Sequence, residues 1–450
     1  MPATCDLLLK GATVVNHDGS APRDIAVTAG RITAIGDIPA SAAGETVDCR
    51  GLHILPGVID TQVHFREPGL EHKEDLATGS RAAVAGGVTA VFEMPNTHPP
   101  TTSAESLADK LARAHHRMFC DFAFFVGGTP QNVDALPELE RLPGCAGVKV
   151  FMGSSTGPLL VHDDEGVAAI LRQIVRRASF HAEDEFRLAE RRSRQIHQDP
   201  SSHPDWRDEE AARRSVERLL RLARAAGKRV HVLHVTSHGE LALLARHRDV
   251  ASVEVTPHHL TLVAPEAYRR LGTLAQMNPP VRDAAHQAAL WQAVRSGLID
   301  ILGSDHAPHS REEKAKPYPA SPSGAPGVQT LVPLMLDHVA AGRLTLERLV
   351  DLTSHGPARL FQVARKGRIA EGYDADLTVI DLKARRTITD DWIESRCGWT
   401  PYDGMTVQGW PVGTVVRGRR AMWEGTIAEA PAGEAIAFLE CLPRRNAEDV

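Results

Sequence analysis

The stretch GVIDTQVHF, residues 57–65, is a short apolar run that ends in polar residues, and similar runs return along the middle of the chain. Most of them are followed by helical stretches such as EGVAAILRQIVRRA (165–178) and HQAALWQAVRSG (286–297). Eight strand–helix units within roughly 300 residues are typical of an α/β fold of the TIM-type (β/α)8 barrel class rather than of an open sheet. The other strand-like runs are VTAVFEMPN (88–96), DFAFFVGG (121–128), GVKVFM (147–152), ASFHAE (178–183), VHVLHVTS (230–237), SVEVTPHH (252–259) and GLIDILGSDH (297–306).

The two ends of the chain have a different pattern, in which apolar and polar residues alternate in short runs separated by Gly, Asn and Asp. This pattern, present in residues 5–36 and again in 366–382, predicts antiparallel strands and hairpins. We therefore expect residues 1–55 and 364–450 to form one small β-sandwich domain with a C-terminal tail. Residues 56–363 are expected to form the barrel, and we expect it to be the catalytic domain because barrels of this class carry active sites at one face.

Composition limits the classes of function. Among 450 residues, 51 Lys and Arg stand against 57 Asp and Glu, and the formal net charge is −6. This mild acidity, without a basic run, argues against a nucleic-acid partner. The six cysteines are scattered, which indicates reduced thiols in a cytoplasmic protein. No segment resembles a signal peptide or is apolar enough to span a bilayer, so no membrane partner is expected, and the polar end NAEDV (446–450) is expected to fray.

Polar residues stand in or at the ends of five of the predicted strands. In a β/α barrel the carboxyl ends of the strands form the active-site face, so residues far apart in the sequence converge there. Histidine and carboxylate are the usual ligands of zinc and related divalent ions, and a catalytic site leaves one position for water. The sequence therefore predicts a metal site made of His64, Lys149, His181, His234 and Asp305.

Taken singly, these residues have ordinary explanations, because a lone histidine at a strand end is usually just hydrogen-bonded. We expect His197, His203 and His231 to be of this ordinary kind; the first two lie in the charge-rich insert 190–210, which is expected to be a helical excursion at the barrel mouth. Lys149 differs, because a charged amine in a buried apolar strand is costly. It needs a partner or a modification, such as addition of carbon dioxide to give a carbamate that can bridge two metals.

A series of long motifs runs in order along the chain: DTQVHFREPG (60–69), EMPNT (93–97), GVKVFMGSSTG (147–157), FHAEDE (180–185), HVLHVTS (231–237), MNPPVR (277–282), GSDHAPH (303–309) and GAPGVQT (324–330). With these motifs the chain resembles the dihydroorotases of the amidohydrolase superfamily over nearly its whole length. The resemblance implies a metal-dependent barrel and a small sandwich built from both chain ends. It implies reversible exchange of dihydroorotate and water with N-carbamoyl-L-aspartate, a step of pyrimidine synthesis. A homodimer, and association with other enzymes of that pathway, are expected on the same ground.

The resemblance also implies roles for the predicted metal ligands. His64 and Asp305 match positions that bind the more buried metal, and His181 and His234 match positions that bind the second. Lys149 matches a carboxylated lysine that bridges the two. Zinc, one or two ions per chain, is the expected metal.

Gln62 departs from the family pattern, which commonly has His-x-His in the first strand. A glutamine carbonyl oxygen is a weaker, neutral ligand than imidazole. Gln62 is therefore either a poor ligand, which leaves the occupancy of the first metal site open, or a residue that orients water or substrate.

The chemistry expected from this family is hydrolysis of a ring amide by a metal-bound water whose pKa is lowered towards neutrality. Asp305 would accept the proton of the nucleophile and deliver it to the departing ring nitrogen. The substrate carboxylate needs a planar two-pronged donor, which Arg66 offers. The resemblance further implies that Asn96 and His309 share that carboxylate, that Asn278 contacts the ring, and that the backbone of Ala325 to Gly327 meets the remaining ring amide.

Two alternatives stay open from the sequence. The first is a hydantoinase or allantoinase, with the same metals and another ring; Arg66, Asn96 and His309 favour a carboxylate-bearing substrate instead. The second is a catalytically silent homologue that acts as an assembly partner. Such chains typically lose several ligands and the catalytic acid, whereas here only Gln62 departs.

Overall fold

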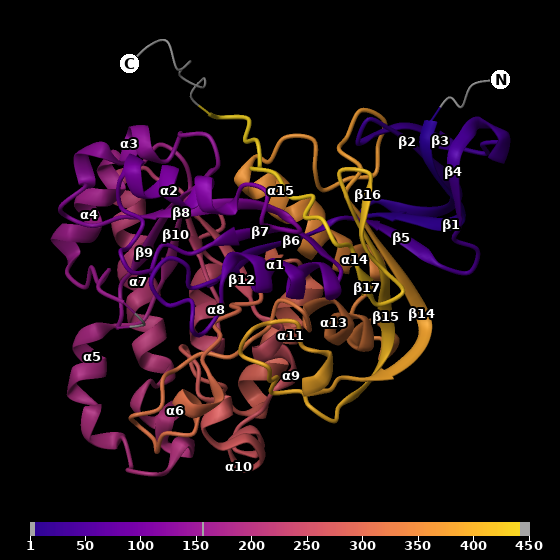
Figure 1. Cartoon of the computed structure of the whole chain (residues 1–450). Helices are drawn as coiled ribbons and strands as arrows, with labels where there is room; N and C mark the ends of the chain where they lie inside the picture. Colours follow the sequence, from indigo (N-terminus) through magenta and orange to yellow (C-terminus); the bar gives the residue numbers. More distant parts are fainter. Residues whose placement is uncertain (1–4, 155–156, 442–450) are drawn as a thin grey trace.

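The protein is described by a computed structural model that covers residues 5–154 and 157–441, so the expected frayed end at 446–450 lies outside the described residues. At its centre lies the predicted barrel of eight parallel strands, which neighbour one another in chain order (Figure 1). The strands are β6 (Val58–Val63), β7 (Val88–Glu93), β8 (Asp121–Gly127), β9 (Cys145–Phe151), β10 (Ala178–His181), β11 (Val230–Val232), β12 (Ala251–Val255) and β13 (Ile301–Leu302).

The barrel closes between its first strand and the segment that follows its last strand. Val63 forms a parallel bridge with His306, and the amide of His64 donates to the His306 carbonyl at 2.7 Å. This closure places the residues that follow β6 directly beside those that follow β13. It therefore brings His64 and Asp305 together although they are distant in the sequence.

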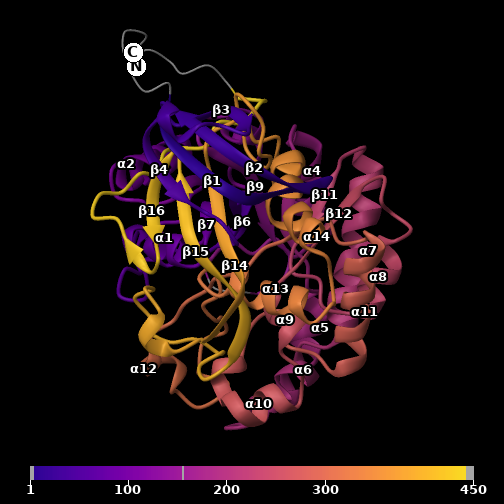
Figure 2. The same cartoon turned by 90° about the vertical axis from the view of Figure 1, so that its right-hand side faces the viewer.

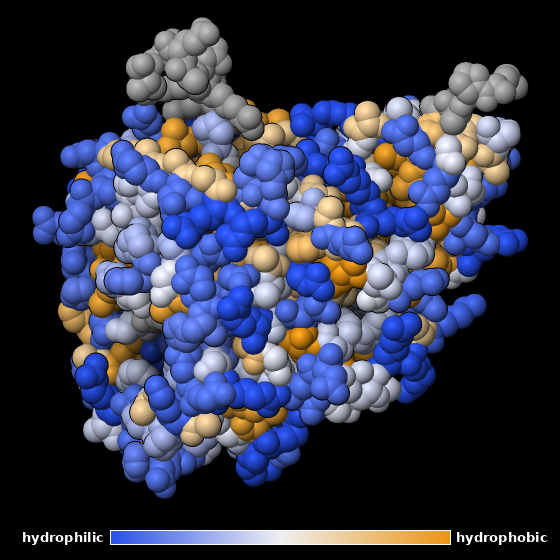
Figure 3. Space-filling model, viewed as in Figure 1, coloured by the Kyte–Doolittle hydropathy of each residue, from blue (hydrophilic) through white to orange (hydrophobic). Residues whose placement is uncertain are grey.

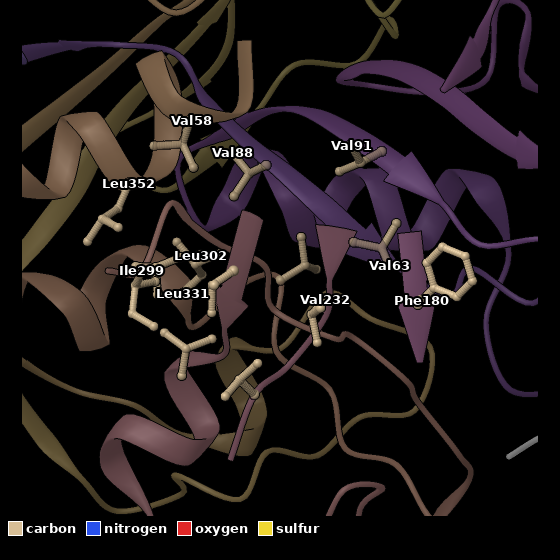
Figure 4. Close-up of a cluster of buried hydrophobic side chains, with 14 of the residues drawn as sticks. Val58, Val63, Val88, Val91, Phe180, Val232, Ile299, Leu302, Leu331 and Leu352 are labelled. Carbon is tan, nitrogen blue, oxygen red and sulfur yellow. The ribbon is translucent and has the colours of Figure 1, made fainter. Parts of the chain in front are cut away.

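The strands are apolar because both of their faces are covered. Every residue of β6 to β9 is buried. Figure 4 shows side chains of the outer layer, where Val58 and Val88 of the strands gather near Leu331 and Leu352 of the surrounding helical segments. Parallel strands that are buried on both sides read as continuous runs of Val, Ile and Phe, which is why the runs could be recognised in the sequence.

Helices cover the outside of the barrel, and their ends follow local rules. Asp75, Ser103 and Ser237 accept backbone hydrogen bonds as N-caps of α1, α2 and α8. Gly227 and Gly297 end α7 and α11 in the left-handed conformation, which glycine adopts without steric cost. The helices are α1 (Leu76–Ala85), α2 (Ala104–Ala114), α3 (Leu136–Leu139), α4 (Asp164–Gln173), α5 (Glu185–Glu190), α6 (His203–Trp206), α7 (Glu209–Ala226), α8 (His238–Leu244), α9 (Pro257–Thr261), α10 (Glu266–Leu271), α11 (Ala284–Ser296), α12 (Arg311–Lys314), α13 (Leu331–Ala340), α14 (Leu346–Val350) and α15 (Gly356–Phe361).

Strands from both chain ends pair, as predicted, where β5 runs antiparallel to β14. In Figure 2 the indigo strands β1 and β2 of the N-terminal end lie in the same region as the orange and yellow strands β14 and β15. Hydrogen bonds join all nine strands of this region into one mixed sheet. Ile32 and Val415, from strands near opposite ends of the sheet order, belong to one buried cluster, so the sheet folds around its own core. The strands are β1 (Cys5–Asn16), β2 (Gly19–Thr28), β3 (Arg31–Gly36), β4 (Ala43–Asp48), β5 (His53–Pro56), β14 (Leu377–Thr387), β15 (Thr406–Val416), β16 (Arg419–Trp423) and β17 (Thr426–Ile427).

A cluster of buried charges joins this sheet to the start of β8, and we call it the junction cluster. Lys366 lies 2.5 Å from Asp121 and also binds Asp376, while Nε of Arg417 lies 2.9 Å from Asp121. The amide of Glu434, in the segment that follows the sheet, donates to Asp121 at 2.8 Å. The last described segment of the chain is thus bound to the barrel as well as to the sheet.

The surface combines charged residues with scattered apolar ones. Hydrophilic side chains cover much of the face shown in Figure 3, and hydrophobic residues appear between them in small groups. Within residues 5–154 and 157–441, no helix combines the length and apolar character needed to cross a membrane.

Candidate active site

The carboxyl ends of the barrel strands converge on one narrow pocket with a volume of about 20 Å³, so its polar side chains contact one another directly. All the residues predicted as metal ligands line it, together with Arg66, Asn96 and Asn278. The complete lining is Gln62, His64, Arg66, Asn96, Lys149, Phe151, His181, His234, Asn278, Asp305, Ala307, Ser323 and Gly324.

The backbone of the pocket is strained at three of these residues. Arg66, His234 and Asp305 have φ values of 66°, 37° and 48°, a region that residues other than glycine seldom adopt. Such a conformation costs on the order of 1–3 kcal/mol and occurs preferentially at functional sites. Each of the three follows a barrel strand, where the turn directs its side chain to the pocket.

His64 and Asp305 form the first pair of candidate metal ligands. Nδ1 of His64 lies 2.7 Å from Oδ1 of Asn96, so Nδ1 carries the hydrogen and donates it. Burial lowers the pKa of His64, and in the neutral ring Nε2 then carries a lone pair that faces Oδ1 of Asp305 at 3.2 Å. Burial raises the pKa of Asp305, but the polar groups around it, His64 first among them, hold the pKa of this carboxyl below its ordinary value. Two acceptors that face each other in this way suit a cation between them.

Gln62 lies beside the first pair. Its Nε2 donates to Oδ1 of Asp305 at 3.0 Å, which identifies the nitrogen, because a carboxylate oxygen only accepts. Its Oε1 is buried and has no hydrogen-bond partner among the described residues. The amide thus keeps one oxygen for a ligand of the pocket, which is consistent with both interpretations of Gln62 stated above.

His181 and His234 form the second pair. Nε2 of His181 donates to Glu183 at 2.9 Å, and Glu183 is held in turn by Arg207 at 2.5 Å. Nδ1 of His181 therefore carries a lone pair, and it faces Nε2 of His234 at 2.9 Å. Burial lowers the pKa of both imidazoles, which keeps them in the neutral form that binds metals. A carboxylate behind a metal-binding histidine is a common way to fix its tautomer.

Glu183 and Arg207 were not predicted as site residues. The signal for Glu183 was its position two residues after His181, because alternate residues of a strand point to the same side. Arg207 gave no comparable signal, because it lies far along the insert that follows β10 and returns to the pocket only in the folded chain.

Lys149 lies in β9 and is 1% exposed. Its Nζ lies 4.5 Å from the ring centroid of Phe151, and within the described part of the chain its amine forms no hydrogen bond. Burial lowers the pKa of Lys149 to about 7, although Asp305 and Glu254 oppose the shift. Much of this amine is therefore neutral near pH 7, and the neutral amine is the form that can add carbon dioxide.

Two further carboxyls lie in the barrel strands near the pocket. Glu254 of β12 accepts a hydrogen bond from Thr61 at 3.0 Å, and burial raises its pKa to about 8. Asp60 of β6 accepts from the amides of Gln62 and Ser304, and burial raises its pKa to about 7. Acidic residues inside the apolar runs of two strands were the sequence signal for both, and neither was predicted.

The donor set fits divalent metal ions. In residues 5–154 and 157–441, no three His, Cys, Asp or Glu side chains already form a group that could hold an ion, and the donors instead face each other in pairs. Nδ1 of His234 and Oε1 of Gln62 are buried without a hydrogen-bond partner among the described residues. Neutral imidazoles, a carboxylate and unsatisfied polar atoms around one pocket are the chemistry that zinc and related ions require.

Arg66 lies at the pocket wall and is 2% exposed. Its Nε donates to the carbonyl of Pro308 at 3.1 Å, and no carboxylate of the described residues forms an ion pair with it. The neighbouring carboxylate of Glu67 binds Arg117 instead, at 2.7 Å. Burial lowers the pKa of Arg66 to about 10, so the guanidinium stays charged at neutral pH. The pocket therefore presents a buried cation without a counter-ion.

His309 lies beside Arg66 but is not part of the pocket lining. Its Nε2 donates to the carbonyl of Ser323 at 3.0 Å, and its Nδ1 lies 3.2 Å from the amine of Lys73. Both ring nitrogens thus have protein partners, and one of them, Lys73, was not predicted. The role of His309 toward a carboxylate stays a prediction.

The backbone of Ala325 and Gly327 is also engaged with the protein. The carbonyl of Ala325 accepts from the amide of Ala307 at 2.9 Å, and the amide of Gly327 donates to Nδ1 of His306 at 3.1 Å. The neighbouring residues 323–324 line the pocket instead. The contacts predicted for Ala325 and Gly327 with a substrate ring therefore stay predictions.

His203 was expected to be ordinary, and the structure places it against a residue of the pocket. It is fully buried, and its Nε2 lies 3.0 Å from Oδ1 of Asn278. No local pattern could show this contact, because His203 belongs to the insert that follows β10 and Asn278 to the segment that precedes α11.

The chain is similar to known proteins over nearly its whole length. The model of the amidohydrolase family matches residues 53–421. A dihydroorotase of Methanosarcina acetivorans is 36% identical across 99% of this chain and 97% of its own length. An allantoinase of Rubrobacter xylanophilus is 36% identical across 96% of this chain and 97% of its own length. The solved structure of an L-hydantoinase (dihydropyrimidinase) from Arthrobacter aurescens superimposes with a TM-score of 0.91 at 30% identity, across 96% of this chain and 99% of that one.

Proposed function

The chain belongs to the amidohydrolase family, and we propose that it is a metal-dependent cyclic amide hydrolase whose substrate is dihydroorotate. The reaction is the reversible exchange of (S)-dihydroorotate and water with N-carbamoyl-L-aspartate, a step in the synthesis of pyrimidine nucleotides. Support comes from the pocket at the barrel mouth and from the dihydroorotases among the relatives of the chain.

The single observation that carries the choice of substrate is Arg66. A buried guanidinium without an ion pair among the described residues is costly unless an anion binds it. Dihydroorotate carries a carboxylate on its ring, and the planar fork of arginine binds a carboxylate with two hydrogen bonds. Hydantoin and allantoin have no carboxylate on the ring, so they would leave this charge unpaired.

We propose that Zn²⁺, one or two ions per chain, binds at the paired donors. His64, Asp305 and Gln62 would hold one ion, His181 and His234 the other, and a carboxylated Lys149 would bridge them. Divalent ions bound there would supply Lewis acidity, which lowers the pKa of water and polarises a carbonyl.

The side chains of the chain itself supply binding and proton transfer. Arg66 binds the substrate carboxylate, with Asn96 and His309 beside it. This contact positions the ring amide next to the proposed metal ligands. Asp305 is ionised at neutral pH because its pKa is held low, so it can accept a proton from the attacking water. As oxygen adds to the ring carbonyl carbon, the C–N bond breaks and Asp305 delivers the proton to the ring nitrogen. Ring closure is the reverse of these steps.

A second candidate is a hydantoinase or allantoinase, which is favoured by an allantoinase relative and by the structural match to an L-hydantoinase. Both reactions open a cyclic amide and use the same kind of donor set. A silent homologue is disfavoured, because the pocket keeps every predicted ligand other than the histidine that Gln62 replaces.

We also propose a cytoplasmic homodimer that associates with other enzymes of pyrimidine synthesis. Cys5, Cys49, Cys120, Cys145 and Cys397 are thiols that form no disulfide among the described residues, which is the state expected in a reducing compartment.

The test is a substrate panel. The purified chain, supplied with Zn²⁺ and bicarbonate, is assayed on dihydroorotate, hydantoin and allantoin, and on N-carbamoyl-L-aspartate for the reverse reaction. The proposal expects the highest kcat/KM with dihydroorotate and measurable ring closure. A higher kcat/KM with hydantoin or allantoin would replace it with the second candidate, and no turnover of any ring would support a silent homologue.

A further inference from the structure

Three separate segments of the barrel mouth meet at His203. This residue begins α6 in the insert between β10 and α7, which lies beside the loop that follows β13 in Figure 1. Nε2 of His203 lies 3.0 Å from Oδ1 of Asn278 and 3.1 Å from the carbonyl oxygen of Met277. Its Nδ1 lies 3.3 Å from the hydroxyl of Tyr318, in the loop after β13. The imidazole is fully buried among these groups.

The hydrogens of this cluster can be assigned from chemistry alone. A backbone carbonyl only accepts, so the contact with Met277 requires that Nε2 of His203 carries a hydrogen. The Asn278 atom that faces the same nitrogen must then be its oxygen, because its NH₂ group would oppose a second donor. Burial lowers the pKa of His203 to about 3, so the ring is neutral and its Nδ1 accepts from the hydroxyl of Tyr318.

We propose that His203 is a positioning residue that fixes the orientation of the Asn278 amide, with the oxygen held against the imidazole and the NH₂ group left for the substrate. The proposal rests on the proposed function, because it concerns how the same pocket recognises its ring. Asn278 lines that pocket. Its NH₂ group can donate to a ring carbonyl, whereas a reversed amide would place its own oxygen against that carbonyl.

This orientation bears on selectivity among rings. The oxygen and the NH₂ group of an asparagine amide are nearly identical in shape, but one accepts and the other donates hydrogen bonds. A fixed neighbouring group therefore decides which of the two the substrate meets. His203 comes from the insert, and it is held by Tyr318 from another loop. The two loops together therefore determine whether the pocket donates to the ring or accepts from it at this position.

The competing explanation is that His203 only anchors the insert to the barrel mouth. Three variants separate the two roles. His203→Leu removes all three hydrogen-bond contacts of the imidazole at similar volume, and His203→Gln restores an amide NH₂ group that can donate to Asn278. His197→Ala is the control, because His197 lies in the same insert and is exposed.

Steady-state kinetics of the Zn²⁺-supplied protein provide the test, together with thermal unfolding of each variant. For His203→Leu we expect KM to rise about 5- to 20-fold, with kcat within about 2-fold of wild type. The reason is that the neutral hydrogen bond from Asn278 to the substrate ring stabilises the ground state and the transition state equally. We expect His203→Gln to recover most of the loss and His197→Ala to match wild type. An unchanged KM in His203→Leu would overturn the proposal. So would a joint loss of kcat and thermal stability that His203→Gln does not restore.

The outcome can be distinguished from failure of the proposed function. Wild type is first assayed on dihydroorotate and on hydantoin, and the variants are compared on whichever ring it opens. If wild type prefers hydantoin, the proposed substrate is wrong, and the shift in KM of His203→Leu still decides the role of His203.

Discussion

The molecule contains two clusters of buried charged residues, the junction cluster and the pocket, and their charges are paired in different ways. In the junction cluster, Lys366 binds two carboxylates and Asp121 also binds Arg417, so each charge faces an opposite one. In the pocket, Arg66 has no ion pair and Lys149 no hydrogen bond among the described residues. Both clusters are buried, and they differ in whether their partners belong to the chain.

The difference separates stability from function. Charges that are paired within the chain stabilise one arrangement of sheet and barrel, and removal of one partner leaves the other buried and unpaired. Buried charges and polar atoms without partners in the chain lower the free energy of unfolding, and proteins keep them where a bound ligand supplies the missing partner. Variants in the pocket should therefore reduce turnover and leave stability nearly unchanged, and variants in the junction cluster should do the reverse.

The largest expected effect is at Asp305. Asp305→Asn keeps the shape of the side chain and removes the group that moves the proton, so we expect kcat to fall about 1,000-fold or more. The melting temperature should stay within a few degrees of wild type. Steady-state kinetics and thermal unfolding measure both, with Asp391→Asn, at an exposed position, as the matched control. Near-normal turnover of Asp305→Asn would move the proton transfer to another residue.

Lys149 should give the next largest effect. Lys149→Ala removes the amine that we propose to be carboxylated, and we expect kcat/KM to fall about 100-fold or more, because a ligand shared by both ions is lost. Short carboxylic acids added to the variant should restore part of the activity, since their oxygens can occupy the same space. Lys383→Ala, at an exposed position, is the control. Full activity and metal content in Lys149→Ala would show that Lys149 bridges nothing.

The junction cluster should respond in the opposite way. Lys366→Met leaves the carboxyls of Asp121 and Asp376 buried without their shared cation, and we expect a loss of about 3–5 kcal/mol in the free energy of unfolding. The kcat/KM of the folded protein should stay within about 2-fold of wild type. Urea unfolding followed by an activity assay at low urea tests both. If Lys366→Met is as stable as Lys383→Met, the assignment of stability to this cluster is wrong.

Gln62 should give a smaller effect, because it changes a single donor within the pocket. If its amide oxygen is a weak ligand, one metal is held firmly and the other is lost on dialysis against dilute chelator. Gln62→His should then strengthen binding at the depleted site about 10- to 100-fold and raise the content towards two ions per chain. Elemental analysis after dialysis decides. A wild-type chain that keeps two ions as tightly as Gln62→His would show that Gln62 faces water or substrate instead.

The barrel and most of the pocket could be predicted from the sequence for a physical reason. Each strand is buried on both faces and therefore appears as an apolar run, and barrel geometry brings the ends of all runs to one face. His64, His181 and Asp305 could be placed together in this way without any knowledge of their contacts.

The rest depends on contacts that local patterns do not encode. His203 reaches Asn278 from the insert, and Arg207 reaches Glu183 from the same insert. Arg66 could form an ion pair with the neighbouring carboxylate of Glu67, but in the folded chain Glu67 binds Arg117. Such contacts form only when separate loops pack against each other. This is why the contacts of His203 and Arg207 could not be predicted, whereas the residues predicted as metal ligands do line one pocket.

The measurement that tests the central claim most directly is the ratio of kcat/KM for dihydroorotate to that for dihydrouracil. The two rings differ only in the carboxylate that Arg66 is proposed to bind. We expect wild type to prefer dihydroorotate about 100-fold or more, because a site built to bind an anion rejects an analogue that leaves its charge unpaired. Arg66→Gln should abolish most of this preference. Equal turnover of the two rings by wild type, or a preference that survives Arg66→Gln, would contradict the account.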